Sequence, residues 1–157
     1  MTSHFAPTEF RLPAGAHPRI EAFHALWQDK GQGDLPRSSL FDVATLDAQY
    51  PLLTRIGMDE SGKSLMWLDV ANAAQWPFKT PVKNRPVIES VPQTSIKRVI
   101  GAFKQTLASG IPDYYETTSW TDIGRTVSLA RIAVPVKGEA LTELMVYWEV
   151  IEAHEVS

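Results

Sequence analysis

The chain contains no cysteine among its 157 residues. Disulfide bonds, thiolate metal sites, cysteine-ligated iron–sulfur clusters and cysteine nucleophiles are therefore excluded, and the composition fits a reducing compartment. Long hydrophobic runs are also missing, since no stretch approaches the roughly 20 apolar residues that a membrane helix needs. The N-terminus lacks the basic start and apolar run of a signal peptide. We therefore expect a cytoplasmic protein with no membrane insertion.

The sequence also has no excess of basic residues. Lysine and arginine number 15 against 18 aspartates and glutamates, which gives a net charge of -3 at pH 7. A mildly acidic chain has no broad attraction to a phosphate backbone, so we expect no nucleic-acid partner. The hydrophobic fraction of 44% and the charged fraction of 21% are those of an ordinary globular domain.

Motifs for catalysis and cofactor binding are missing as well. The four histidines (His4, His17, His24 and His154) include no His-x-x-x-His pair. No serine lies in a Gly-x-Ser-x-Gly elbow, and no glycine-rich phosphate loop is present. We therefore expect no catalytic residue, no metal site and no cofactor, and a colourless purified protein.

The first third of the chain predicts a flexible arm over residues 1–16 and a helical extension over residues 17–50. Proline is favoured at the first helical position, so a helix is expected to begin at His17-Pro18. Two glycines end this helix at residues 31–33. Asp42 is placed to cap a second, short helix.

The first predicted helix carries one apolar stripe, made of Ile20, Phe23, Leu26 and Trp27. Burying each of these side chains is worth ~1.5–3 kcal/mol, so the stripe is too costly to leave in water. It could pack on the chain's own sheet or meet a second copy of the chain. We expect a homodimer in which these four residues form the interface, because the stripe precedes the compact part of the sequence.

The rest of the chain, residues 51–157, predicts a sheet and one long helix. Strand patterns occur at residues 52–58, 64–70, 114–120, 125–136 and 141–151. Four prolines between residues 71 and 92 favour short turns or single-turn helices. Apolar residues at helical spacing then predict a long helix, capped by Thr94 or Ser95. The predicted class is α+β: a five-stranded antiparallel sheet with the long helix across it and an N-terminal helical extension.

The fourth predicted strand does not alternate cleanly. Val127 and Leu129 share one parity, whereas Ile132 and Val134 share the other. This pattern predicts either a bulge near Ala130-Arg131 or burial of the strand on both faces.

Four short motifs accompany this order of elements: Leu26-Trp27, Leu35-Pro36-Arg37-Ser38, Asp42, and the pair Arg131 and Pro135. The order of hairpin, short helices, long helix and three-stranded meander resembles the PAS sensory fold, from Leu52 to Glu152. The motifs resemble those of small single-domain PAS-like proteins common in alphaproteobacteria. The resemblance implies a non-enzymatic sensory or adaptor domain of bacterial signal transduction that acts through protein–protein contacts. The implied partners are histidine kinases or other signalling proteins, with a small ligand as a modulator.

A ligand would bind between the sheet and the long helix. The residues predicted to line that pocket are Trp67, Trp120, Arg131 and Trp148. Core or interface packing is the alternative for the tryptophans. Arg131 could instead face solvent or pair with Glu116 or Glu149 across the sheet.

A second function remains open from the sequence. A small cone-shaped α+β enzyme or carrier of the ketosteroid-isomerase-like kind also wraps helices on a curved sheet. It would need a carboxylate with a tuned pKa in a deep cavity, such as Asp69 or Glu116 beside a tyrosine.

Overall fold

The computed structural model describes residues 10–71, 81–91, 93–122 and 125–155, and for residues 117–126 and 152–155 it describes the backbone only. The helices are α1 (Pro18–Gly31), α2 (Val43–Leu46) and α3 (Gln93–Ser109), with short 3-10 turns η2 (Ser38–Leu40) and η4 (Val87–Glu89). The strands are β1 (Leu53–Met58), β2 (Leu65–Val70), β3 (Asp113–Asp122), β4 (Arg125–Lys137) and β5 (Thr142–Glu155). The α+β class and the five predicted strands are confirmed.

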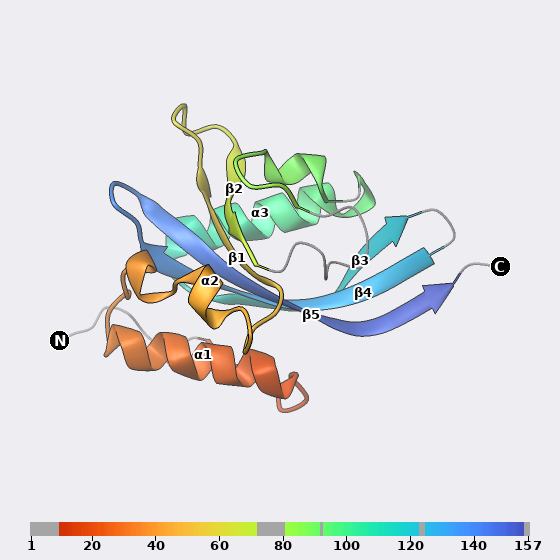
Figure 1. Ribbon diagram of the computed structural model, residues 1–157, viewed down its shortest axis with the longest axis horizontal. Coiled ribbons are helices and arrows are strands. Elements are labelled where there is room, and N and C mark those ends of the chain that lie inside the picture. Colours follow the sequence, from red (N-terminus) through yellow and green to blue (C-terminus); the bar gives the residue numbers. More distant parts are fainter. Residues whose placement is uncertain (1–9, 72–80, 92, 123–124, 156–157) are drawn as a thin grey trace.

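The strands form one antiparallel sheet in the order β2-β1-β5-β4-β3. The N-terminal hairpin therefore joins the free edge of the C-terminal meander, and β5 lies in the middle of the sheet. Helix α3 covers one face, whereas α1 and α2 lie on the other (Figure 1). The sheet is thus the central layer of three.

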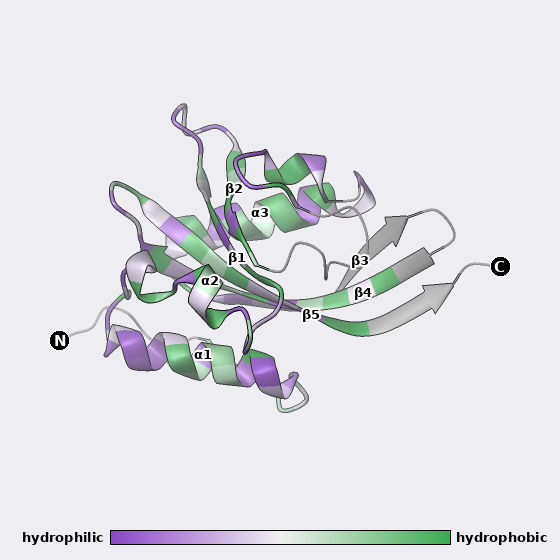
Figure 2. Ribbon diagram, in the orientation of Figure 1, coloured by the Kyte–Doolittle hydropathy of each residue, from purple (hydrophilic) through white to green (hydrophobic). Residues whose placement is uncertain are grey.

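Each face of the sheet has its own hydrophobic core. The core on the α3 side includes Trp67, Val99, Phe103, Leu144 and Trp148. The core on the α1 side includes Ile20, Phe23, Trp27, Ile132 and Tyr147. Figure 2 shows the apolar residues following the strands that lie between the helical layers. Two cores require central strands that are apolar on both sides.

Strand β4 meets this requirement, and the prediction of burial on both faces is confirmed. Val127 and Leu129 point to the α3 side, whereas Ile132 and Val134 point to the α1 side. The register also shifts near Ala130-Arg131, so the predicted irregularity is present as well. On the β3 side Arg131 pairs with Tyr115 and Leu129 with Thr118, which leaves two β3 residues opposite Ala130. On the β5 side the partners of Ser128 and Leu129 are Glu152 and Val150.

The apolar stripe of α1 packs on its own sheet, which corrects the predicted dimer interface. Ile20 and Phe23 are fully buried, Trp27 is 2% exposed, and Leu26 packs partly buried against the same core. This is the alternative in which the stripe packs on the chain's own sheet, and the homodimer itself stays a prediction. The second apolar face of β4 and β5 covers the stripe, so a second subunit is not needed to do so.

The helix starts follow the predictions at two of three places. His17 caps α1 by accepting the Arg19 N–H at Nδ1, and Asp42 caps α2 by accepting the Ala44 N–H. The predicted cap of α3 is wrong, because α3 begins at Gln93 and both Thr94 and Ser95 lie inside its first turn.

Candidate functional site

The predicted pocket residues lie together in the core between the sheet and α3. Trp67, Arg131 and Trp148 are all fully buried. The Trp67 and Trp148 ring centroids are 6.4 Å apart, and the Phe103 ring lies edge-on to Trp148 at 6.1 Å. The Trp120 side chain lies outside the described residues. The three described side chains and Phe103 thus belong to the buried core between the sheet and α3, and their role in binding a ligand stays a prediction.

The polar ends of both tryptophans are used inside the protein. The Trp67 indole N–H donates to Ser90 Oγ at 3.2 Å. The Trp148 indole N–H donates to Thr54 Oγ1 at 3.2 Å, and that hydroxyl donates in turn to the Val146 carbonyl at 2.8 Å. Buried indoles with such partners behave as core residues, which matches the packing alternative.

Arg131 points inward and is held by aromatic rings and a carboxylate. Its guanidinium carbon lies 5.5 Å from the Phe103 ring centroid and 5.1 Å from that of Tyr115. Its Nη2 lies 3.6 Å from Asp113 Oδ2. Burial lowers the pKa of Arg131 to about 10 although the Asp113 charge opposes the shift, so the side chain stays charged at neutral pH.

The two partners considered for Arg131 from the sequence lie elsewhere. Glu116 is exposed and accepts a hydrogen bond from the Tyr114 hydroxyl. Glu149 belongs to the other face of the sheet, where it accepts hydrogen bonds from Tyr147 and Arg19. Because the Arg131 side chain points inward, its carboxylate partner is Asp113 instead.

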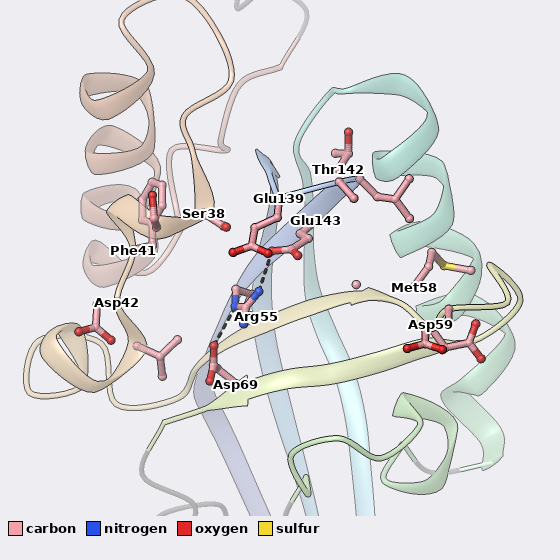
Figure 3. Close-up of a pocket in the computed structure, with 16 residues that line it drawn as sticks. Ser38, Phe41, Asp42, Arg55, Met58, Asp59, Asp69, Glu139, Thr142 and Glu143 are labelled. Atoms are coloured by element: carbon pink, nitrogen blue, oxygen red, sulfur yellow. Dashed lines mark hydrogen bonds and ion pairs between the residues drawn. The ribbon is translucent and has the colours of Figure 1, made fainter.

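An open cleft lies at the end of the sheet face that α1 leaves uncovered. Its volume is about 800 Å³. The walls come from η2 and α2, from the β1–β2 hairpin, and from the turn between β4 and β5 (Figure 3). The side chains that matter most to its chemistry are Asp42, Arg55, Asp59, Glu60, Asp69, Glu139, Leu141 and Glu143. We take this cleft as the candidate functional site.

Close packing of the β4–β5 turn shapes one wall. The Gly138 N–H donates to the Leu141 carbonyl at 3.0 Å and closes the turn. A Cβ atom at Gly138 would collide with that same carbonyl oxygen and with the Glu143 carboxylate. Glycine at this position therefore allows Leu141 and Glu143 to take their places in the wall.

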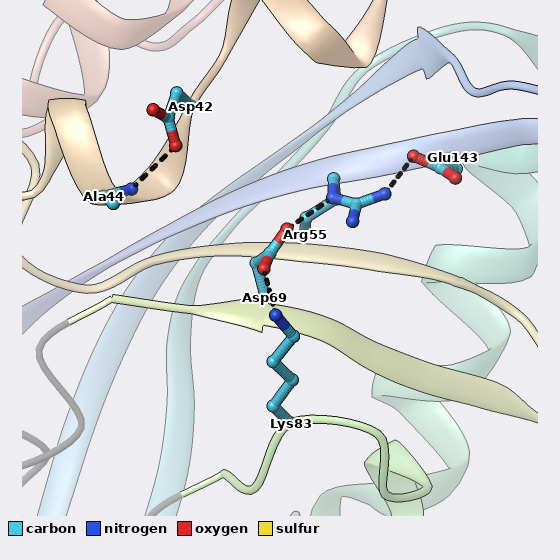
Figure 4. Close-up of polar contacts among 6 residues, drawn as sticks. All are labelled: Asp42, Ala44, Arg55, Asp69, Lys83 and Glu143. Carbon is cyan, nitrogen blue, oxygen red and sulfur yellow. Dashed lines mark hydrogen bonds and ion pairs between the residues drawn. The ribbon is translucent and has the colours of Figure 1, made fainter.

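Arg55 organises the floor of the cleft. Its Nε donates to Asp69 Oδ2 at 2.7 Å and its Nη1 donates to Glu143 Oε1 at 2.8 Å (Figure 4). Lys83 Nζ reaches the other Asp69 oxygen at 3.1 Å. Burial raises the pKa of Asp69, but the hydrogen bonds and charges of Arg55 and Lys83 outweigh it and leave the pKa below 3.8. Three strands are thereby joined across the floor by charged side chains.

This arrangement suits binding better than catalysis. A general acid or base needs a pKa near the working pH, whereas Asp69 is held ionised by two cations. Among the described residues no three metal-ligating side chains converge. In the part of the chain that the structure describes, no histidine lines the cleft.

Sequence reasoning missed the cleft, because its walls come from segments 38–43, 55–60 and 139–143, which are far apart in the chain. The usable signal was the acidic pair Asp59-Glu60 at the first hairpin turn. It was weak, because Lys63 follows in the same turn and Lys137 precedes Glu139 in the other.

No family model, no curated protein and no solved structure matches the chain. Within the described residues, none of the helices has the length and apolar character of a membrane span.

Proposed function

We propose that this protein is a non-enzymatic PAS-like sensory or adaptor domain that acts in bacterial signal transduction through protein–protein contacts. The order of hairpin, short helical turns, long helix and three-stranded meander supports the proposal. The proposed partners are histidine kinases or other cytoplasmic signalling proteins. A small ligand bound between the sheet and α3 would modulate these contacts.

Parts of the motifs that carry the PAS resemblance lie close together on β4. The Trp27 indole N–H donates to the Pro135 carbonyl at 2.8 Å. The Pro36 carbonyl accepts the Lys137 N–H at 2.8 Å, and Arg37 forms a parallel bridge with Lys137. Arg131 points instead to the α3 side, where it lies beside Phe103.

The single observation that carries the proposal is the open cleft on the sheet face opposite α3, which motif residues help to line. The core on the α3 side is packed with buried rings of Trp67, Phe103 and Trp148. The cleft lies on the opposite face and is lined by side chains from three hairpin or helical segments. Asp42, one of the motif residues, is among the residues that line the cleft. An open, preformed surface beside the shared motifs suits the docking of a protein.

The ketosteroid-isomerase-like alternative receives little support from the same geometry. Asp69 lies in an open cleft, ion-paired with Arg55 and Lys83, and its pKa is lowered where a catalytic carboxyl would need it raised. Glu116 does lie beside a tyrosine, Tyr114, but it is exposed on β3.

Site-specific photo-cross-linking in cells tests the proposal. A photoreactive amino acid is placed at Leu141 on the cleft and, as a matched control, at Lys104 on the exposed side of α3. We expect Leu141 to cross-link one or a few proteins that carry kinase, receiver or related signalling domains, and Lys104 to give none of them. Equal products at both positions, or a Leu141 product restricted to metabolic enzymes, would refute the proposal.

A further inference from the structure

We propose that the cleft binds a basic segment of a partner protein, rich in lysine or arginine and carrying a large apolar side chain. The inference rests on the proposed function, because it names the chemistry of the partner at the same surface. The walls of the cleft are charged, the rim is partly apolar, and the sheet face between the walls is uncovered.

The cleft concentrates the negative charge of the molecule. Its lining holds six carboxylates, from Asp42, Asp59, Glu60, Asp69, Glu139 and Glu143, and one cationic residue, Arg55. A second cation, Lys83, pairs with Asp69 from outside the lining, so carboxylates remain in excess. The whole chain has a net charge of only -3. The remaining surface is therefore close to neutral or basic, and the field that attracts a cationic partner originates at this site.

Half-enclosed walls strengthen that field. Asp69 and Glu143, at 30% and 17% side-chain exposure, share the Arg55 guanidinium on the floor. Glu60 and Glu139 are exposed and come from two different turns. A cation between them would meet carboxylates from both sides while remaining close to the sheet.

The rim adds an apolar contact. Leu141 is 61% exposed within the lining. A large aliphatic side chain held in water at the wall of a cleft favours a partner that brings its own apolar side chain.

A metal ion fits this cleft less well than a basic peptide does. Calcium and magnesium need several oxygen ligands at one point. Asp42 and Asp59 already accept hydrogen bonds from Thr45 and Ser61, and no three ligating side chains converge within the described residues. Distributed carboxylates match a chain of separate cations instead.

A phage-displayed library of random peptides, panned on the immobilised full-length chain, tests the inference without a known partner. We expect the enriched peptides to combine lysine or arginine with leucine, isoleucine or an aromatic residue. A labelled enriched peptide should then bind Glu60→Lys/Glu139→Lys roughly tenfold more weakly, since rim charges govern attraction. Leu141→Ser should also weaken binding. The matched control Glu21→Lys/Asp29→Lys places the same charge change on the exposed face of α1 and should leave binding unchanged.

Each result decides the question. Neutral or acidic enriched peptides, or no enrichment over uncoated beads, would overturn the inference. Equal weakening by the cleft and α1 reversals would reduce it to general charge attraction and overturn it too. Displacement of the peptide by calcium but not by sodium at equal ionic strength would assign the site to a metal ion. Cross-linking of a signalling protein at Leu141 through an acidic segment would refute the basic-segment inference and leave the proposed function standing.

Discussion

Trp27 on α1 donates its indole N–H to the carbonyl oxygen of Pro135 on β4, at a distance of 2.8 Å. The bond is buried, and it joins two residues that are 108 positions apart. Around it, Phe23 contacts the rings of Phe41, Tyr50 and Tyr147. Helix α1 and the sheet therefore share one core and form one folding unit.

This relationship predicts the effect of changing Trp27. Trp27→Phe removes the donor and leaves a buried carbonyl, which should cost about 1–3 kcal/mol of unfolding free energy. Trp27→Ala also opens a cavity and should cost about 3–5 kcal/mol. Urea denaturation measures both, with the exposed neighbour Gln28→Ala as the control. A Trp27→Ala midpoint equal to that of the control would mean that α1 does not anchor on the sheet.

The opposite core gives a second prediction. Phe103 is fully buried at the centre of α3 and contacts both Trp148 and Arg131. Phe103→Ala should destabilise the protein by about 3–5 kcal/mol, since it removes a ring and leaves a cavity beside a buried charge. The adjacent exposed variant Lys104→Ala should have little effect. An unchanged unfolding midpoint in Phe103→Ala would show that α3 is not a core element.

The long helix illustrates what the sequence could predict. Its apolar stripe includes Val99 and Phe103, and these residues lie fully buried against the sheet. The five strands were predicted in the same way, from the local pattern of apolar residues. The spacing of apolar residues shows which side of a helix or strand is buried, so elements with one regular spacing could be predicted.

The spacing of apolar residues on a helix does not tell which surface covers them. The stripe of α1 was visible in the sequence. The mixed parity of Val127 and Ile132 indicated a second apolar face on β4, but it did not show that α1 packs there. The cleft was hidden for a related reason. Arg55 meets Asp69 and Glu143 only because strand register brings three strands together, with Arg55 opposite Asp69 on β2 and Met145 on β5. Register depends on the whole sheet rather than on local sequence.

A third prediction concerns pH. The pKa of Asp69 is lowered in the folded protein, because Arg55 and Lys83 outweigh the effect of burial. A depressed folded-state pKa contributes stability above the unfolded value, which is 3.8 here, and that contribution is lost as the pH falls below it. The unfolding free energy of Asp69→Asn should therefore decline less steeply with acidification in this window than that of the wild type. Urea titrations at a series of pH values measure the slopes, with Asp29→Asn on α1 as the control. Identical slopes in the wild type and Asp69→Asn would contradict the ion-paired floor.

The central claim is that this domain engages its partner through the cleft rather than through the α3 side. Hydrogen–deuterium exchange of the full-length chain, alone and with the protein cross-linked at Leu141 added in excess, tests it most directly. The account predicts new protection in residues 38–43, 55–60 and 139–143, and unchanged exchange in α3. Protection confined to α3, or spread evenly over both faces of the sheet, would contradict it.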